Sequence, residues 1–214
     1  MSEKKLLYFY DALCGWCYGF RPVLQQLHDK YGQDLPFEVV SGGMVLGERE
    51  GPIGEVAAYI KDAYRQVELT TGVTFGAGFL KGILADGTAR FSSWYPAVAL
   101  EVFRSEKPDQ ALDFAHALQN AVYHTGIRPA VPEAYSPLAA EFGLNASLFV
   151  DRLDQEVFAE RARDQFRKTA SFQVGGFPTL ILQYGEEYFM ISRGYMGLDM
   201  LDFRLEQVLA AQER

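Results

Sequence analysis

The sequence predicts an α/β fold in which a long helical segment separates two segments that mix strands and helices. Near the N-terminus, the apolar run from Leu6 to Tyr10 has the character of a strand, and a pattern of helical spacing follows it. Between residues 48 and 167, apolar side chains recur mostly at helical spacing. After Pro178 come two short apolar runs and an amphipathic pattern, so the chain is expected to end in strand, strand and helix.

Length and composition limit the possible classes of protein. The chain has 214 residues, which suits one domain or one domain with a large insertion. With 49% hydrophobic and 22% charged residues it is not expected to be disordered, and no apolar run is long enough to predict a membrane span. The net charge of −8 disfavours binding to nucleic acid or to an anionic membrane surface. The first apolar stretch is too short for a secretory signal, so a cytoplasmic location is expected.

Two cysteines, Cys14 and Cys17, follow the first predicted strand. A structural disulfide that closes so short a loop would stabilise little, and a cytoplasmic location disfavours it. A structural zinc site takes four ligands, whereas His28, His116 and His124 are not spaced as ligand pairs. We therefore expect no metal and no resident cofactor, and we interpret the cysteine pair as redox-active.

The helix predicted to begin at the cysteine pair gives its two thiols different surroundings. Apolar residues at helical spacing between Phe20 and Leu27 indicate this helix. Free N–H groups and the positive end of the helix dipole stabilise a thiolate at Cys14. Cys17 lies one turn further on the same side and is expected to be less exposed. Cys14 is thus the candidate attacking thiol and Cys17 the candidate resolving thiol, with Gly15 and Trp16 as candidate substrate-binding residues.

The remaining elements follow in order along the chain. A strand is expected at Phe37–Val40, where Glu38 is expected to face solvent rather than to act as a buried acid behind Cys17. Glycines between residues 72 and 87 predict a loop, and no Gly-Lys-Ser/Thr sequence makes it a phosphate loop. Pro178 is expected to open a strand, since proline is tolerated at a strand's start. Helical patterns in the middle begin near Ile53, Trp94, Leu112, Tyr135 and Phe149, and the last strand and helix are expected at 188–192 and 198–209.

The cysteine pair and the sequence Gly176-Phe177-Pro178-Thr179, which precedes the strand–strand–helix end, resemble the thioredoxin superfamily. The helical middle narrows this resemblance to the DsbA-like branch, in which a helical domain is inserted into a thioredoxin fold. Residues 5–45 and 168–212 carry the resemblance, and Asp11 fits the Asp-x-x-Cys pattern of cytosolic members. It implies a discontinuous thioredoxin-like domain at 1–47 and 168–214, with an inserted helical domain at 48–167.

The resemblance also implies an activity and a site. Cys14 and Cys17 would act as a protein-disulfide oxidoreductase or isomerase, and Pro178 would form a cis peptide bond beside them. The backbone of Phe177 would pair with a substrate peptide. The implied partners are protein or peptide disulfides and dithiols, with glutathione as a candidate co-substrate and a thioredoxin-type reductant as a candidate electron donor.

Two departures from the family pattern leave details open. The residues between the cysteines are Gly-Trp rather than the Pro-His of strongly oxidising members, so neither direction nor reduction potential is predicted. Phe177 is bulkier than the usual Thr or Val, and it either adds an apolar contact or narrows the groove. A glutathione-dependent isomerase or transferase of the kappa type stays an alternative, although that branch has serine where Cys14 stands. A redox-regulated, chaperone-like binding module is a third hypothesis.

Overall fold

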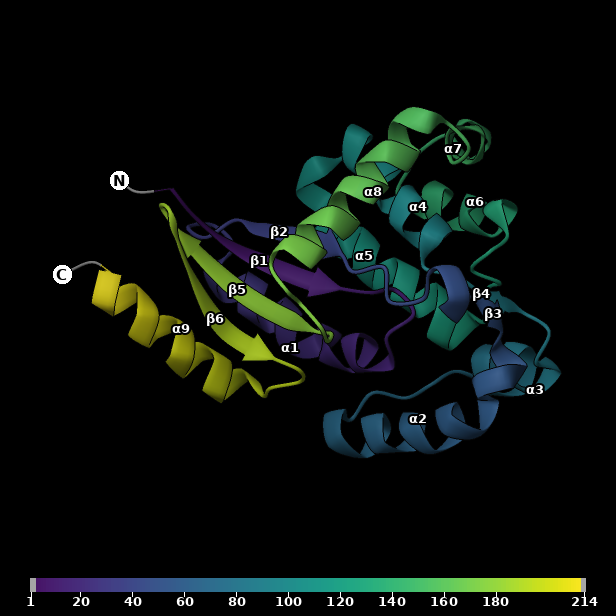
Figure 1. Cartoon of the computed structure of the whole chain (residues 1–214), viewed down its shortest axis with the longest axis horizontal. Helices are drawn as coiled ribbons and strands as arrows, with labels where there is room; N and C mark the ends of the chain where they lie inside the picture. Colours follow the sequence, from purple (N-terminus) through teal and green to yellow (C-terminus); the bar gives the residue numbers. More distant parts are fainter. Residues whose placement is uncertain (1–2, 213–214) are drawn as a thin grey trace.

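The computed structural model describes residues 3–212 and contains a four-stranded sheet made from both ends of the chain (Figure 1). Its strands are Lys4–Tyr10 (β1), Phe37–Ser41 (β2), Thr179–Tyr184 (β5) and Glu187–Arg193 (β6), and their order is β2–β1–β5–β6. β1 runs parallel to β2 and antiparallel to β5, and β6 runs antiparallel to β5. Residues 1–2 and 213–214, the outer ends of the predicted domain limits, lie outside the described residues.

β1 occupies the inside of the sheet because both of its faces are apolar. Leu6, Tyr8 and Tyr10 belong to the core on one face, while Leu7 and Phe9 belong to the core on the other. All five are almost completely buried. A strand that is covered on both faces has apolar residues at consecutive positions rather than at every second one. For this reason the strand could be predicted from the sequence.

Different segments cover the two faces of the sheet. Helices Gly15–Tyr31 (α1) and Leu198–Gln212 (α9) pack on the face of Tyr8, through residues such as Phe20 and Leu201. The segment from Phe172 to Phe177 packs on the opposite face against Leu7 and Phe9. The predicted α/β fold, with a strand–helix start and a strand–strand–helix end, is confirmed.

The middle of the chain is mostly helical, as predicted. Its α-helices are Ala57–Thr71 (α2), Leu84–Asp86 (α3), Trp94–Glu106 (α4), Ala111–Asn120 (α5), Ser136–Glu141 (α6), Ala146–Arg152 (α7) and Glu156–Ser171 (α8). Shorter turns of helix are Gly47–Arg49 (η1), Ile53–Val56 (η2), Gly78–Ile83 (η3), Pro108–Gln110 (η4), Ala121–Thr125 (η5) and Pro132–Tyr135 (η6). A small ribbon of Gly51–Pro52 (β3) and Arg90–Phe91 (β4), which the sequence did not predict, joins them.

The core of the sheet continues into this helical segment. Phe103 of α4 and Phe114 of α5 stack with ring centroids 4.1 Å apart, and they belong to the same hydrophobic cluster as Leu6 of β1 and Leu201 of α9. The predicted boundary between residues 167 and 168 lies inside α8, which contacts both α4 and β2. The helices therefore support the sheet directly, and the predicted domain limits stay a prediction.

The glycine-rich segment between residues 72 and 87 is not simply a loop, because it contains η3 and α3. A Cβ atom at Gly78 would lie 1.9 Å from the carbonyl oxygen of Thr125, and one at Gly76 would lie 2.1 Å from that of His124. Gly78, the first residue of η3, and Gly76 just before it thus allow the backbone there to contact that of η5 closely. The sequence showed the glycines but not the partner segment that requires them.

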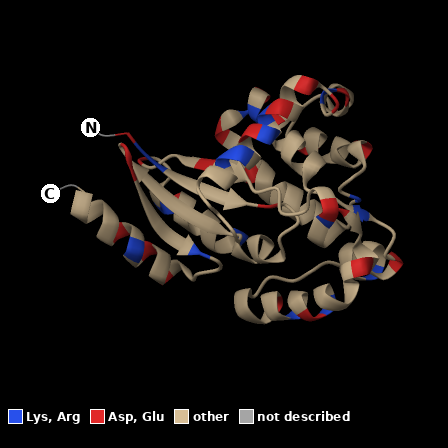
Figure 2. Cartoon of the chain, in the orientation of Figure 1, with Lys and Arg blue, Asp and Glu red and all other residues tan. Residues whose placement is uncertain are grey.

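Charged residues of both signs are spread over the helices (Figure 2). Acidic and basic residues are interspersed along α8 (Figure 2), where Arg163 and Arg167 pair with acids on the same helix. Exposed pairs of this kind contribute little to stability. None of the helices within residues 3–212 combines the length and apolar character that crossing a membrane needs.

Candidate active site

The two cysteines lie at the start of α1, where the chain leaves β1. Cys14 is the residue that precedes the first turn of the helix, and Cys17 lies within that turn. Both thiols are free. Cys14 is 6% exposed and Cys17 is fully buried, so the two sulfurs differ in access as the spacing predicted.

The loop before β5 reaches the same place from the other end of the chain. The Phe177–Pro178 peptide bond is cis, and the Cys14 thiol donates to the carbonyl oxygen of Phe177 over 3.5 Å. Gly42 makes room for this loop, because a Cβ atom there would lie 2.2 Å from the ring of Phe177. The structure thus brings together residues that are 163 positions apart in the sequence.

Cys14 opens into a cavity of about 490 Å³, which is within the usual size range of small-molecule sites. Four of the six predicted site residues line it, namely Cys14, Gly15, Trp16 and Phe177. The other two, Cys17 and Pro178, are buried and do not line the cavity. Access to the pair is therefore through Cys14.

The cavity has two walls of different origin. One wall, which we call the thiol wall, is made by Cys14, Trp16 and Phe177. The facing wall, which we call the α2 wall, is made by Tyr59, Ile60, Ala63, Tyr64 and Val67 of the inserted segment. Tyr59 is 73% exposed, so it lies at the mouth of the cavity. The three residues of the thiol wall were predicted from the sequence as site residues. That α2 also lines the cavity was not predicted.

One cation lies at this otherwise neutral cavity. Arg49 is the single charged side chain among the described residues that line it. Its guanidinium makes a long contact, 3.5 Å, with the carbonyl oxygen of Gly43, while the neighbouring Glu50 pairs with Arg90 instead. Arg49 is exposed and remains able to bind an anion that enters the cavity.

The environment of Cys17 favours its neutral form. Burial raises the pKa of the Cys17 thiol well above its usual value, and the hydrogen bond and charge of Cys14 raise it further. A thiol with a raised pKa is a poor nucleophile until it ionises. Cys17 is thus a buried thiol that stays protonated at neutral pH, whereas Cys14 lines the cavity.

Asp11 ties the site to the inserted segment. Its buried carboxylate accepts hydrogen bonds from the amides of Leu13 (2.9 Å) and Met44 (2.7 Å) and from the hydroxyl of Ser93 (2.9 Å). Burial raises the pKa of Asp11, and these donors oppose that shift. The sequence showed an acid next to an apolar strand, but it did not show which distant donors satisfy it.

Glu38 does not lie behind the cysteines. It pairs in register with Leu7, whose side chain lies on the face opposite Tyr8 and Cys17. Its carboxylate forms ion pairs with Lys5 and Lys168, and its side chain is 30% exposed. The structure therefore excludes Glu38 as a buried acid behind Cys17. The prediction that it faces solvent is only partly correct, because the side chain is half-buried between the two lysines.

Comparisons with known proteins agree with this geometry. The model of the DSBA-like thioredoxin domain family matches residues 5–208. A candidate protein disulfide isomerase from Nitrosomonas europaea superposes with a TM-score of 0.85 at 24% identity, over 98% of both chains. The cytosolic disulfide reductase DsbM from Pseudomonas aeruginosa superposes with a TM-score of 0.81 at 26% identity, over 98% of this chain and 100% of that one.

The same reductase has also been solved with glutathione, and that structure superposes with a TM-score of 0.77 at 27% identity, over 95% of this chain and 98% of the other. No curated protein sequence matches the chain. The family match spans nearly the whole chain, and it confirms the thioredoxin fold with a large helical insertion that the sequence predicted. The chain belongs to the family of DSBA-like thioredoxin domains.

Proposed function

We propose that this protein is a cytoplasmic disulfide reductase that exchanges thiols and disulfides at Cys14 and Cys17, with glutathione as its electron donor. The observation that carries the proposal is the pair itself, with one sulfur at the cavity and the other buried directly behind it. The likeness to DsbM, a cytosolic disulfide reductase at 26% identity, supports the direction and the location.

The proposed reaction has two halves. The Cys14 thiolate attacks one sulfur of a substrate disulfide, a mixed disulfide forms, and the first substrate sulfur leaves with the electron pair of the broken bond. Cys17 then loses its proton and attacks Cys14, which releases the second substrate thiol and leaves the pair oxidised. Two glutathione molecules restore the dithiol and become glutathione disulfide, so two electrons pass from glutathione to substrate.

Glutathione suits the cavity in charge as well as in size. The peptide carries two carboxylates, and Arg49 is a cation at the cavity that no described acid pairs with. The DsbM structure with glutathione supports this choice of co-substrate. Trp16 and Phe177 line the same cavity as Cys14, whose sulfur the glutathione thiol must reach.

Turnover tests the function directly. The wild-type protein is expected to reduce insulin and hydroxyethyl disulfide in the presence of glutathione, while Cys14→Ser falls to the uncatalysed rate. Cys17→Ser is expected to lose insulin reduction, because the mixed disulfide on Cys14 is no longer resolved. Full activity of Cys14→Ser would overturn the proposal.

The role of Arg49 is tested by its neutral variant. Arg49→Gln is expected to raise KM for glutathione about fivefold, since an exposed charge-assisted contact contributes roughly 1 kcal/mol. Arg90→Gln is the matched control, because Arg90 is also exposed but does not line the cavity. An unchanged KM in Arg49→Gln would remove Arg49 from the glutathione site without affecting the assignment of the cysteines.

A second candidate is a glutathione-dependent transferase or isomerase, which the apolar α2 wall favours as a surface for a small apolar substrate. Conjugation of glutathione to a model electrophile, with no reduction of disulfides, would favour this candidate. The chaperone-like hypothesis instead expects Cys14→Ser to keep full suppression of client aggregation.

A further inference from the structure

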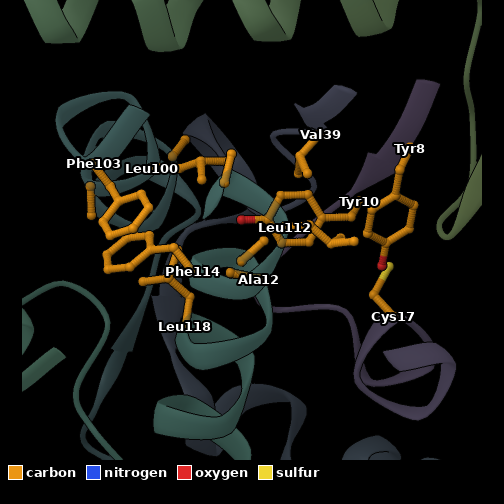
Figure 3. Packing of buried hydrophobic residues seen from close by; sticks show 14 of the residues in the cluster. Tyr8, Tyr10, Ala12, Cys17, Val39, Leu100, Phe103, Leu112, Phe114 and Leu118 are labelled. Atoms are coloured by element: carbon orange, nitrogen blue, oxygen red, sulfur yellow. The ribbon is translucent and has the colours of Figure 1, made fainter. Parts of the chain in front are cut away.

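A buried hydroxyl group lies behind the resolving cysteine. Tyr8, in the middle of β1, is fully buried, and its ring packs near Tyr10 and Phe20 with centroids 5.5 Å and 6.2 Å away. Its hydroxyl points toward the sulfur of Cys17 (Figure 3). The strand and α1 thus hold these two side chains against each other.

The hydroxyl of Tyr8 has no well-directed hydrogen bond to any group within the part of the chain that the structure describes. A buried donor without a partner destabilises a fold, and phenylalanine would fill the same space without that cost. A thiol is a weak acceptor, but a thiolate is a strong one. Tyr8 therefore gains its missing partner at the moment when Cys17 ionises.

No other side chain around Cys17 is arranged to do this. Glu38 lies on the opposite face of the sheet, and the carboxylate of Asp11 is already occupied by three donors. The hydroxyl of Tyr123 donates to the carbonyl oxygen of Leu13. This leaves the Tyr8 hydroxyl as the side-chain donor that faces the sulfur, beside the backbone N–H of Asp11, which lowers the pKa of Cys17.

The charged and titratable groups around the pair are few. Cys14, Asp11, Tyr10 and Tyr123 face Cys17, and a negative charge on Cys14 or Asp11 opposes ionisation. Cys14, Tyr10 and the half-buried Arg21 face Tyr8, and Arg21 brings the positive charge. Burial raises the pKa of Tyr8 well above its usual value, so this hydroxyl keeps its proton and acts as a donor.

We propose that the Tyr8 hydroxyl donates a hydrogen bond to the Cys17 thiolate and thereby promotes the second half of the exchange. This inference rests on the proposed function. In the step concerned, the sulfur of Cys17 attacks that of Cys14, the bond between Cys14 and the substrate breaks, and the proton lost by Cys17 ends on the released substrate thiol. Tyr8 transfers no proton and stabilises the charge on the attacking sulfur.

The size of the effect follows from two opposing consequences of the hydrogen bond. A hydrogen bond to a charged group changes an ionisation equilibrium by about 10- to 100-fold. A thiolate that ionises more readily is also a weaker nucleophile, and about half of the gain is lost. Tyr8→Phe is therefore expected to slow resolution about 3- to 10-fold near neutral pH.

An aromatic disulfide that releases a coloured thiol separates the two halves in one experiment. Ellman's reagent reacts with the reduced protein in a bimolecular phase that reports Cys14, followed by an intramolecular phase that reports Cys17. For Tyr8→Phe we expect an unchanged first phase and a slower second phase at neutral pH. At high pH, where Cys17 is ionised in both proteins, we expect the variant to be the faster one, so the two pH profiles cross.

Tyr135→Phe is the matched control. Tyr135 is also fully buried, but its hydroxyl donates to the carbonyl oxygen of Pro129 at 2.6 Å. This variant is expected to lose thermal stability and keep both phases. Tyr8→Phe is expected to keep or gain thermal stability, because it removes a donor without a partner.

A direct titration tests the inference even if the proposed function fails. In Cys14→Ser, Cys17 is the one cysteine left in the sequence, so the ¹³Cβ chemical shift of labelled cysteine follows this thiol alone. Adding Tyr8→Phe is expected to move this titration to higher pH. If Cys14 proves unreactive with Ellman's reagent, the proposed function fails and the titration still decides the role of Tyr8. Identical titrations with and without the Tyr8 hydroxyl, or second phases with identical pH profiles, would overturn the inference.

Discussion

The two walls of the cavity differ in how they are built and in what they contribute. The thiol wall comes from the two ends of the chain, and it contains the reactive sulfur and the carbonyl group of Phe177 beside it. The α2 wall comes from the inserted segment and offers apolar and aromatic side chains without a nucleophile. From this difference we expect the thiol wall to determine the chemistry and the α2 wall to select which molecules reach Cys14.

The largest effect is expected from removing the carboxylate of Asp11, which joins the segment before Cys14 to the loop after β2 and to Ser93 at the start of α4. Asp11→Ala leaves the amides of Leu13 and Met44 and the hydroxyl of Ser93 without their acceptor. We expect a loss of about 3 kcal/mol in the free energy of unfolding, because buried donors lose a charged partner. Urea denaturation measures it, with the exposed Asp34→Ala as a control that should change little. A loss in Asp11→Ala no larger than in the control would contradict the role given to Asp11.

A change confined to the α2 wall should affect binding alone. Ala63→Trp places a large side chain in the cavity from the side of α2. We expect KM for glutathione to rise about tenfold, which corresponds to roughly 1.4 kcal/mol of binding, with no change in the intramolecular resolution of a mixed disulfide. Gln66→Trp, on the exposed side of the same helix, is the matched control. A slower resolution step in Ala63→Trp would break the proposed division between the walls.

The smallest effect is expected on the face of the sheet that lies away from the thiols. Burial raises the pKa of Glu38, but Lys168 and Lys5 lower it more, so its pKa in the folded protein lies below its usual value. An acid whose pKa is lowered by folding stabilises the protein above its unfolded-state pKa, and this contribution disappears as the pH falls through the folded-state pKa.

Glu38→Gln is therefore expected to lower stability by about 1 kcal/mol near neutral pH and to match the wild type in acid. Urea midpoints measured across the acid range test this expectation. The rate of thiol exchange should be the same in both proteins at every pH, because Glu38 lies on the face opposite Cys17. If Glu38→Gln changed the pH dependence of the exchange rate, Glu38 would take part in the exchange reaction and this expectation would be wrong.

Features that depend on a local stretch of sequence were predicted, and features that depend on contacts between distant segments were not. Cys14 and Cys17 were predicted because their setting is local, between an apolar strand and the first turn of a helix. The four strands of the main sheet, the terminal helix and the helical middle were predicted because their apolar pattern reflects burial. Pro178 was predicted as a site residue; in the structure it is buried and does not line the cavity, whereas its neighbour Phe177 does.

The rest depends on contacts between distant segments. Asp11 meets donors 33 and 82 positions away, and no local pattern identifies them. The approach of α2 to Cys14 depends on how helices pack, which apolar spacing leaves open. Tyr8 reads as an ordinary core residue in a buried strand, and its position behind Cys17 becomes visible only when α1 is placed against β1.

The central claim is that Cys14 forms the mixed disulfide and Cys17 resolves it. Incubation of the two single-cysteine variants with glutathione disulfide, followed by mass spectrometry of the intact proteins, tests this most directly. We expect Cys17→Ser to accumulate one stable glutathione adduct on Cys14 and Cys14→Ser to remain unmodified at neutral pH. An adduct that forms readily on Cys17 in Cys14→Ser, with none on Cys14 in Cys17→Ser, would contradict the assignment.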